Sequence, residues 1–500
     1  MKVQNPVLKM DMPDMDVIRA NGYFYMVSTT MFFTPGAPIL RSKDLKNWEI
    51  VAYIFEKIED NDIYELKNGK NAYGACQWAT SLAFHNGKFY AAFVCNDMKK
   101  TYIFHSHDIE KSNWERFDID GICHDMSFLF WEDKAYFVYG NGDIYISELN
   151  NDLTGINKNG LNQLLFSTPN ADDGIMLRCE GCRAYVKNGY IYLSFIEWPK
   201  EGISTSRRRQ VCYRSKNLLG PYERKVIFDD DMGYFNRGIA QGVFIENDNN
   251  KWYAMLFQDH GAVGRIPYLL PMKWENDWPV IGIEGRAPAE FEIDIEECKT
   301  KSLVTSDAFN YSENKLPLQF QWNHNPLNDA WSFTERKGYL RLKNKQLATN
   351  ILNARNTLTE RTVTPKSVYT IEGDFSNLKN GDIAGICAFM GHYGMIGITK
   401  DEEKFFVYFR LFNGAEKRFE CSNIKGFNCK SFWLRIVFDF ENQDKAFFYY
   451  SCDGNEFISM DDILNMEFTL DVFVGYRLGI FSYPTKEIGG YTDFRNLVFE

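Results

Sequence analysis

Three acidic residues stand at one spacing ahead of a tyrosine that recurs along the chain. Asp14, Asp125 and Glu180 each precede such a tyrosine by 11 or 12 residues. One such acid alone would be read as a turn former, but carboxylates gathered in a narrow cavity raise one another's pKa and cost stability. Paired carboxylates are the groups that cleave glycosidic bonds, because a protonated one donates to the leaving oxygen while an ionised one activates water or attacks carbon. The spacing therefore indicates glycosidic bond hydrolysis, provided that the fold brings the acids together.

A five-fold repeat supplies the elements that would position these acids. Each repeat has an apolar strand, a polar turn and a second strand with an aromatic pair, which is a period-2 hairpin pattern. The repeats cover residues 16–28, 81–93, 127–139, 183–195 and 242–256, and their shared tyrosines are Tyr25, Tyr90, Tyr136, Tyr192 and Tyr253. The tyrosines recur every 46 to 65 residues, close to the roughly 40–50-residue period of propeller blades. The pattern predicts an all-β chain that begins with a five-bladed β-propeller.

The phase of the repeat predicts which residues share a cavity. A propeller gathers the starts of its innermost strands at one mouth of the central channel. The five residues at the same offset before each shared tyrosine are Asp14, Trp78, Asp125, Glu180 and Gln241. We therefore expect three carboxylates, one indole and one amide to line one pocket.

The chain changes character after the fifth repeat. Residues 284–315 lose the repeat and read as a linker with a strand or two. Seven strand-like segments without the blade period follow, beginning at Tyr339, Ser367, Ile383, Lys404, Phe432, Ala446 and Tyr476. Antiparallel strands in such a series predict a β-sandwich. The predicted domains are a propeller over residues 1–300 and a sandwich over residues 301–500.

Charge and composition exclude several classes of partner. The net charge is −11 and the isoelectric point is about 5.4. The densest basic spot, Arg207 to Arg209, reads as a solvated turn, so nucleic acid and anionic membranes are poor partners. The chain shows no signal-peptide pattern and no apolar run long enough to cross a membrane, and we expect it to be cytoplasmic. The eleven cysteines lack framework spacing and are expected to be reduced, and Cys179-x-x-Cys182 has no second half that would complete a metal site.

Short motifs around the candidate acids resemble those of glycoside hydrolase family 43. Residues 13–19 (PDMDVIR) are similar to its base motif, while residues 124–128 (HDMSF) and 180–181 (EG) resemble the segments that hold its modulating Asp and its general acid. Residues 41–48 (RSKDLKNW) and 77–79 (QWA) follow in the family's order. The second domain resembles the concanavalin-A-like sandwich of the β-xylosidase branch, so the resemblance covers nearly the whole chain.

The resemblance assigns a role to each candidate residue. It implies Asp14 as general base, Glu180 as general acid, and Asp125 as the group that raises the pKa of the acid and orients it. It also implies that Arg265 binds sugar hydroxyls beside Glu180. Phe32, Phe33 and Trp78 would form the wall of the sugar pocket, although burial in the core is an equal reading for the two phenylalanines. The implied mechanism is single displacement with inversion, which requires carboxyl groups about 6.5–9.5 Å apart.

Three departures from the family pattern stand out. Met15 and Asp16 replace the common Pro-Ser after the base, and Cys182-Arg183 replaces a Pro-His type of sequence after the acid. Gln241 stands where many relatives carry a histidine that orders water or calcium. No cofactor is required by this chemistry, and a structural calcium ion stays compatible with the sequence.

The function expected from these observations is exo-acting removal of terminal xylose from β-1,4-xylo-oligosaccharides. The alternative is α-L-arabinofuranosidase activity, alone or alongside it, because xylopyranose and arabinofuranose present similar hydroxyls. A non-catalytic carbohydrate-binding protein is the rival from another class, but it would lose one of the three carboxylates. A fructan-cleaving enzyme is disfavoured because its Asn-Asp-Pro-Asn-Gly motif is missing. The expected partner is a small oligosaccharide, and a homo-oligomer is compatible with the sequence.

Overall fold

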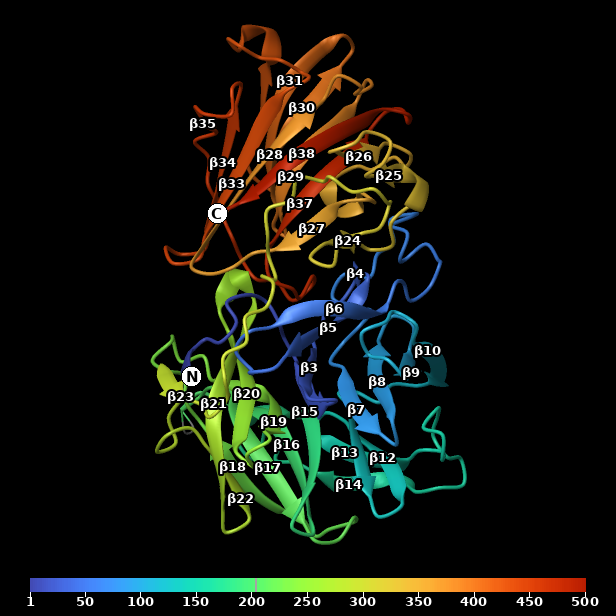
Figure 1. Cartoon of the computed structure of the whole chain (residues 1–500), viewed down its shortest axis with the longest axis vertical. Coiled ribbons are helices and arrows are strands. Elements are labelled where there is room, and N and C mark those ends of the chain that lie inside the picture. The colour runs from blue at the N-terminus through green and yellow to red at the C-terminus, as the bar shows by residue number, and fades with distance from the viewer. Residues whose placement is uncertain (203–204) are drawn as a thin grey trace.

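The chain folds into a propeller followed by a sandwich, as Figure 1 shows. A computed structural model describes residues 1–202 and 205–500. Five four-stranded antiparallel sheets form the propeller, and two eight-stranded sheets form the sandwich. The predicted all-β class, the five-bladed propeller and the sandwich are confirmed. None of the helices in the described residues is long and apolar enough to span a membrane.

The propeller blades follow one another along the chain. Their strands are β2 (Asp16–Ala20), β3 (Tyr23–Val27), β5 (Gly36–Ser42) and β6 (Glu49–Phe55); β7 (Ser81–His85), β8 (Lys88–Cys95), β9 (Lys100–Ser106) and β10 (Glu115–Asp120); β11 (Ser127–Trp131), β12 (Lys134–Tyr139), β13 (Asp143–Glu148) and β14 (Asn162–Ser167); β15 (Ile175–Lys187), β16 (Tyr190–Pro199), β17 (Arg209–Ser215) and β18 (Glu223–Phe228); and β19 (Ala240–Glu246), β20 (Trp252–Asp259), β21 (Arg265–Glu275) and β22 (Trp278–Ile281). A separate pair joins β1 (Lys2–Gln4) to β23 (Glu290–Glu292).

Each predicted hairpin is the first strand pair of a blade. At three of the five tips, Asn21, Asn86 and Asn188 have positive φ and are followed by a glycine that also has positive φ. This is the two-residue turn whose twist matches that of the flanking strands. The first strands of neighbouring blades contact one another in sequence order, and β19 contacts β2, so the ring is closed.

The sandwich consists of two sheets and includes one strand from the propeller half of the chain. The first sheet contains β32 (Glu416–Glu420), β31 (Lys404–Leu411), β30 (Gly394–Asp401), β29 (Asp382–Phe389), β37 (Arg477–Pro484), β27 (Leu358–Arg361), β24 (Gln321–Asn323) and β4 (Phe33–Thr34). The second contains β25 (Trp331–Ser332), β26 (Leu340–Lys343), β38 (Tyr491–Phe499), β28 (Lys366–Asp374), β33 (Phe432–Asp439), β34 (Lys445–Ser451) and β35 (Ile458–Ser459), with β36 (Leu464–Asn465) beside β34. Short 3₁₀ helices are η1 (Gly261–Val263), η2 (Asn328–Ala330), η3 (Ile351–Asn353) and η4 (Cys421–Asn423).

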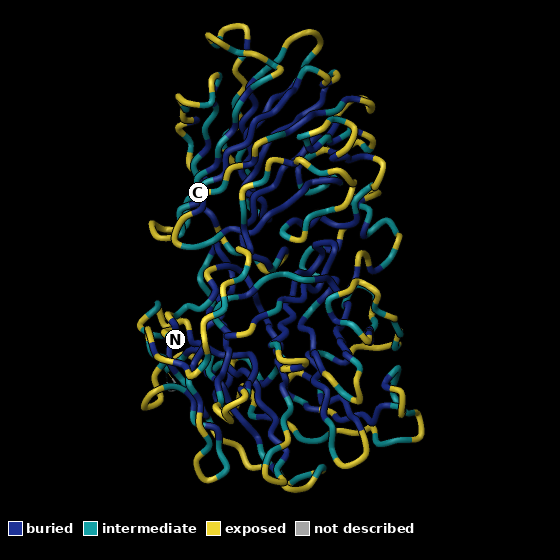
Figure 2. The backbone as a smooth tube through the Cα atoms, viewed as in Figure 1, coloured by how far each residue is buried: buried dark blue, intermediate teal, exposed yellow. Residues whose placement is uncertain are grey.

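The two domains share one apolar core. The largest cluster of buried side chains runs from the first blade into the sandwich, and Figure 2 shows buried backbone continuing through both halves. Strand β4 lies at this junction, because Thr34 pairs with Trp322 and Phe33 with Asn323 of β24. The predicted boundary at residue 300 falls between β23 and β24. The relative position of the domains is therefore fixed by a sheet and a core that both domains build.

The expectation that Phe32 and Phe33 form the wall of the sugar pocket is wrong. Both side chains are fully buried. The Phe32 ring stacks on His324, with centroids 4.9 Å apart, and the Arg477 guanidinium lies 3.7 Å from the centroid of the Phe33 ring. Recruitment of β4 into the sandwich sheet turns both rings into the domain junction.

A buried arginine connects three blades at the centre of the propeller. Arg183 donates to the backbone carbonyls of Asp14 and Thr80, both at 3.1 Å, and its Nε lies 3.4 Å from Oδ2 of Asp16. Oδ2 of Asp16 also accepts a hydrogen bond of 2.8 Å from the backbone N–H of Leu82. Burial raises the pKa of Asp16, and the charge of Arg183 opposes that rise. Two departures from the family pattern, Asp16 and Arg183, are thus partners in one buried ion pair.

We expect Arg183→Met to lower the free energy of unfolding by about 3–5 kcal/mol at pH 7, because it leaves the Asp16 carboxylate buried without its cation. The double variant with Asp16→Asn removes that charge and should recover part of the loss. Denaturant unfolding of the wild type and both variants measures the two effects. If Arg183→Met and the double variant had equal free energies of unfolding, the unpaired Asp16 charge would not be the cause of the destabilisation.

Candidate active site

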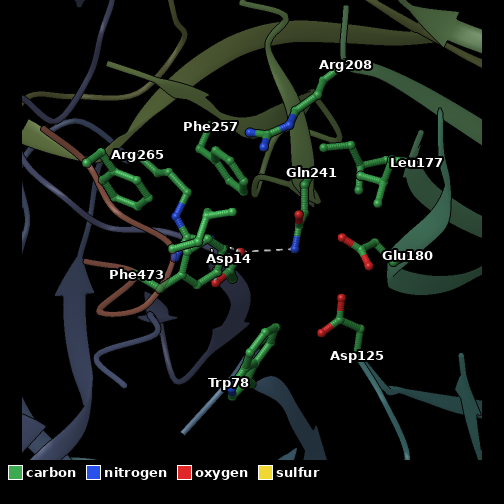
Figure 3. A pocket seen from close by; sticks show the side chains of 14 residues that line it. Asp14, Trp78, Asp125, Leu177, Glu180, Arg208, Gln241, Phe257, Arg265 and Phe473 are labelled. Carbon is green, nitrogen blue, oxygen red and sulfur yellow. Dashed lines mark hydrogen bonds and ion pairs between the residues drawn. The ribbon is translucent and has the colours of Figure 1, made fainter. Parts of the chain in front are cut away.

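The five residues of the predicted ring line one small pocket at the mouth of the propeller channel. Figure 3 shows the side chains of Asp14, Trp78, Asp125, Glu180 and Gln241 around a common space. The cavity has a volume of about 150 Å³. The five residues that the phase of the repeat predicts to share a cavity thus lie together in the structure.

The local backbone explains how these side chains reach the pocket. Asp14 and Asp125 precede their blades by two residues and have φ of 53° and 48°, and Gln241 has φ of 63°. Left-handed backbone is uncommon for residues other than glycine, and it concentrates at functional sites. Glu180 and Gln241 lie inside their strands, at register shifts of β15 and β19. Such bulges re-aim a side chain, which here turns both residues into the pocket.

Asp14 is held on one side of the pocket by two donors. Arg265 Nη1 lies 2.9 Å from Oδ1 and 3.1 Å from Oδ2, and Gln241 Nε2 donates to Oδ1 at 3.1 Å. The Asp14 residue is only 5% exposed. These contacts fix the orientation of the carboxylate toward the cavity.

Arg265 lines the same pocket as Glu180, and its ion pair is with Asp14. Its Nε and Nη2 are buried and have no hydrogen-bond partner among the described residues. The Phe473 ring packs against the guanidinium, whose carbon lies 4.6 Å from the ring centroid. A buried donor without a partner is costly, by about 1–3 kcal/mol. Since Arg265 lines the pocket, its free N–H groups are suited to a substrate hydroxyl.

Glu180 is held by two donors that approach the same oxygen. Asn141 Nδ2 lies 2.6 Å from Oε2, and His124 Nε2 lies 3.4 Å from the same atom. His124 Nε2 is also 3.6 Å from Asp125 Oδ2, which accepts a 2.9 Å hydrogen bond from the backbone N–H of Gly181. Asp125 and Glu180 therefore share one cationic neighbour.

The ionisation of this cluster follows from burial and charge. Burial raises the pKa of Asp125 to about 6; the charge of His124 opposes the rise, and the carboxylates of Glu180 and Asp14 add to it. Burial favours neutral His124, but the carboxylates of Asp125 and Glu180 outweigh it and raise the pKa of His124 to about 9. His124 belongs to the HDMSF motif, but its contact with Glu180 of the next blade depends on the fold and is not visible in the motif.

Gly181 is required by a close approach across the channel. It has φ of 67°, and a Cβ at this position would lie 2.7 Å from Cδ of Gln241. Any side chain there would displace Gln241 from Asp14 or move the N–H that Asp125 accepts. The Glu-Gly pair is therefore explained by geometry at the floor of the pocket.

The sandwich completes the pocket with a loop between β36 and β37. Phe468, Leu470 and Phe473 of this loop line the cavity. The Phe473 ring lies 5.8 Å from that of Trp78, between centroids. Asp11 fixes the loop, since one of its oxygens accepts from the backbone N–H of Gly475 at 2.9 Å and the other from that of Arg265 at 2.8 Å.

Arg208 also lines the pocket, contrary to the interpretation of residues 207–209 as a solvated turn. Its guanidinium forms an ion pair with Asp259 and lies 5.1 Å from the centroid of the Trp198 ring. Arg207 and Arg209 are paired as well, with Asp229 and Glu197. The acids that neutralise this basic run lie elsewhere in the chain, so the residues around it do not reveal the pairing.

The donors around Gln241 do not fit a calcium ion. Calcium takes about six to eight oxygen ligands, whereas the Gln241 amide donates to Asp14 and the Arg265 cation occupies the same carboxylate. The donor atoms of His124, Asp125 and Glu180 lie within 4.8 Å of one another. A metal there would have to displace the proton from His124, whose pKa is about 9. All eleven cysteines are free thiols, and Cys179 and Cys182 are buried.

Comparison with known proteins identifies relatives of both domains. The sequence model of glycosyl hydrolases family 43 matches residues 3–279, and that of the β-xylosidase C-terminal concanavalin A-like domain matches residues 306–500. A β-xylosidase of Formosa agariphila is 27% identical, over 98% of this chain and 88% of the relative. A xylosidase/arabinosidase of Butyrivibrio fibrisolvens is 25% identical over 99% of both chains. A solved structure of a protein described as bifunctional GH43-CE, from Bacteroides eggerthii, is 38% identical with a TM-score of 0.92; it covers all of this chain, which spans 63% of that protein.

The raised pKa of His124 can be measured directly. Among the seven histidines, we expect one imidazole to titrate at about pH 9 and another, His260, whose pKa burial lowers, at about pH 4. Asp125→Asn removes an anion beside His124 and should lower the pKa of that imidazole. NMR titration of histidine-labelled protein, with His124→Gln to assign the resonance, measures both. The arrangement is contradicted if no imidazole titrates above pH 8.

Proposed function

The chain belongs to glycosyl hydrolase family 43, and from this premise we propose that it is an exo-acting enzyme that releases terminal xylose from β-1,4-xylo-oligosaccharides. The observation that carries the proposal is the small pocket with three carboxylates, closed on one side by Phe473 of the sandwich. A cavity of about 150 Å³ suits one sugar ring at a chain end better than the middle of a chain. The relatives named β-xylosidase support the choice of sugar.

The positions of the carboxylates support an inverting mechanism. In the view of Figure 3, Asp14 lies on one side of the cavity, and Asp125 and Glu180 lie on the other. A sugar and a water molecule placed between them would meet the base on one face and the acid on the other. Asp14 deprotonates the water, which attacks the anomeric carbon, and Glu180 protonates the departing oxygen.

Asp125 and His124 act on the acid through charge and position. Two donors hold Glu180 by Oε2, which leaves Oε1 to carry the proton to the leaving oxygen. The raised pKa of Asp125, about 6, supports retention of a proton on Asp125 at mildly acidic pH, beside the carboxyl of Glu180. We assign no step to a metal ion, since acid–base hydrolysis needs none.

α-L-Arabinofuranosidase activity is the second candidate, either alone or alongside xylosidase activity. The Butyrivibrio fibrisolvens relative carries both names. A non-catalytic role is disfavoured because all three carboxylates face one cavity. Comparing kcat/KM for 4-nitrophenyl β-D-xyloside and 4-nitrophenyl α-L-arabinofuranoside decides which activity dominates.

The roles of base and acid predict different dependence on the leaving group. Asp14→Asn should lower kcat/KM by about 10²–10⁴-fold for both xylobiose and 4-nitrophenyl β-xyloside, because both need an activated water. Glu180→Gln should affect xylobiose far more, since 4-nitrophenolate leaves with little protonation. Asp133→Asn, at an exposed hairpin tip, is the matched control. Wild-type turnover in either active-site variant would overturn the assignment.

Inversion predicts the anomer of the first product. ¹H NMR during hydrolysis of xylobiose should show α-xylose appearing before mutarotation produces the β form. The reason is that a single displacement reverses configuration at the anomeric carbon. First appearance of β-xylose would mean a double displacement and would remove Asp14 from the role of base.

A further inference from the structure

A second, larger groove lies where the propeller meets the sandwich. Its volume is about 600 Å³, and it shares no lining residue with the catalytic pocket. The propeller contributes the segment between β18 and β19 and helix η1, while the sandwich contributes the turn between β33 and β34 (Figure 1). Asp444 of this turn accepts a 3.0 Å hydrogen bond from the backbone N–H of Ala262. The two walls are therefore joined, and the groove is a fixed part of the fold.

An aromatic platform forms one wall of the groove. Tyr234 stacks on His260, with centroids 4.1 Å apart and planes 19° apart, and the edge of Phe235 meets Tyr234 at 4.9 Å. Phe235 is 81% exposed, the highest exposure among the large hydrophobic residues that the structure describes. Phe235 and Asn236 both have left-handed backbone, with φ of 51° and 55°. This strain, uncommon for a bulky residue, holds an apolar ring outward, where it gains no burial.

Polar side chains line the groove beside the platform. Among the described residues, Lys9 and Glu441 have no ion-pair partner and the Gln443 side chain has no hydrogen-bond partner, while the charge of Arg237 acts on the nearby Asp444 carboxyl. With Asp444, the lining carries two cations and two carboxylates, so its charges balance. A charge-balanced set of donors and acceptors suits hydroxyl groups better than a charged ligand. A flat ring beside such a set suits a ligand with an apolar face and a polar rim.

We propose that this groove binds a neutral oligosaccharide, with a sugar ring stacked on Phe235 and its hydroxyls bound by Arg237, Glu441 and Gln443. The volume lies within the roughly 300–1,000 Å³ of small-molecule sites. The identity of the sugar, a β-1,4-xylo-oligosaccharide, rests on the proposed function.

The groove is adjacent to the catalytic pocket. Strand β20 carries Phe257 in the wall of the pocket and leads to His260 in the wall of the groove. Three residues of strand span about 10 Å. A chain held in the groove raises the local concentration of chain ends at the pocket. The groove should therefore matter for long substrates and have no effect on a small aryl xyloside.

Binding to the groove is tested by isothermal titration calorimetry with xylohexaose in the Asp14→Asn background, which prevents hydrolysis. We expect two binding events, of which one disappears in Asp14→Asn/Phe235→Ala. The control Asp14→Asn/Phe419→Ala removes another exposed phenylalanine, 44% exposed on the sandwich, and should keep both events. A titration that Phe235→Ala leaves unchanged would overturn the proposal.

Kinetics separates this proposal from the proposed function. In the otherwise wild-type protein, Phe235→Ala should lower kcat/KM for xylohexaose several-fold and leave that for 4-nitrophenyl β-xyloside unchanged. If xylohexaose were no substrate, the Asp14→Asn protein would show a single binding event, still removed by Phe235→Ala, and only the proposed function would fail. If Phe235→Ala changed the mass in sedimentation and not the sugar titration, the groove would be an interface between copies and the proposal would fail.

Discussion

The buried ion pair of Arg183 and Asp16 is the constraint on which the geometry of the pocket depends. Arg183 follows Glu180 by three residues, and its guanidinium holds the backbone carbonyl of Asp14. The segments that carry the proposed acid and base are therefore tied through one side chain. A buried ion pair gains little net stability, because desolvation offsets the attraction of its charges. Its effect here is to fix position: neither segment can move without separating the guanidinium from Asp16.

The second constraint is that neither domain encloses the pocket alone. The propeller supplies the ring of five residues, and the sandwich supplies the loop with Phe473, which covers Arg265 and faces Trp78. Asp11 connects the two by accepting from the backbone of Arg265 and of Gly475. The pairing of β4 with β24 of the sandwich also connects the two domains. Closure of the site is thus an outcome of how the domains share their core.

The sequence predicts those parts of the site whose structure depends on residues near one another in the chain. Period-2 alternation, with Asn-Gly turns at three of the five tips, predicts the hairpins. The five pocket residues from Asp14 to Gln241 follow from their nearly equal distance before the shared tyrosine of each hairpin. Phe473 lies in an irregular loop without a periodic pattern, so its own segment did not distinguish it from other aromatic residues. Phe33 was misplaced because its strand pairs with β24, which is almost 290 residues away in the chain. The sequence of a short strand does not reveal a pairing partner that lies so far away in the chain.

The charges at the floor of the pocket come close to balancing. Four carboxylates, those of Asp14, Asp16, Asp125 and Glu180, meet three cations, Arg183, Arg265 and His124. With His124 protonated, as its pKa of about 9 requires at neutral pH, one negative charge is left over. Burial raises the pKa of Asp125 to about 6, so a proton on the Asp125 carboxyl would cancel this charge. The departures at positions 16 and 183 add one anion and one cation together and so preserve this balance. A neutral sugar would then enter a site that is itself close to neutral.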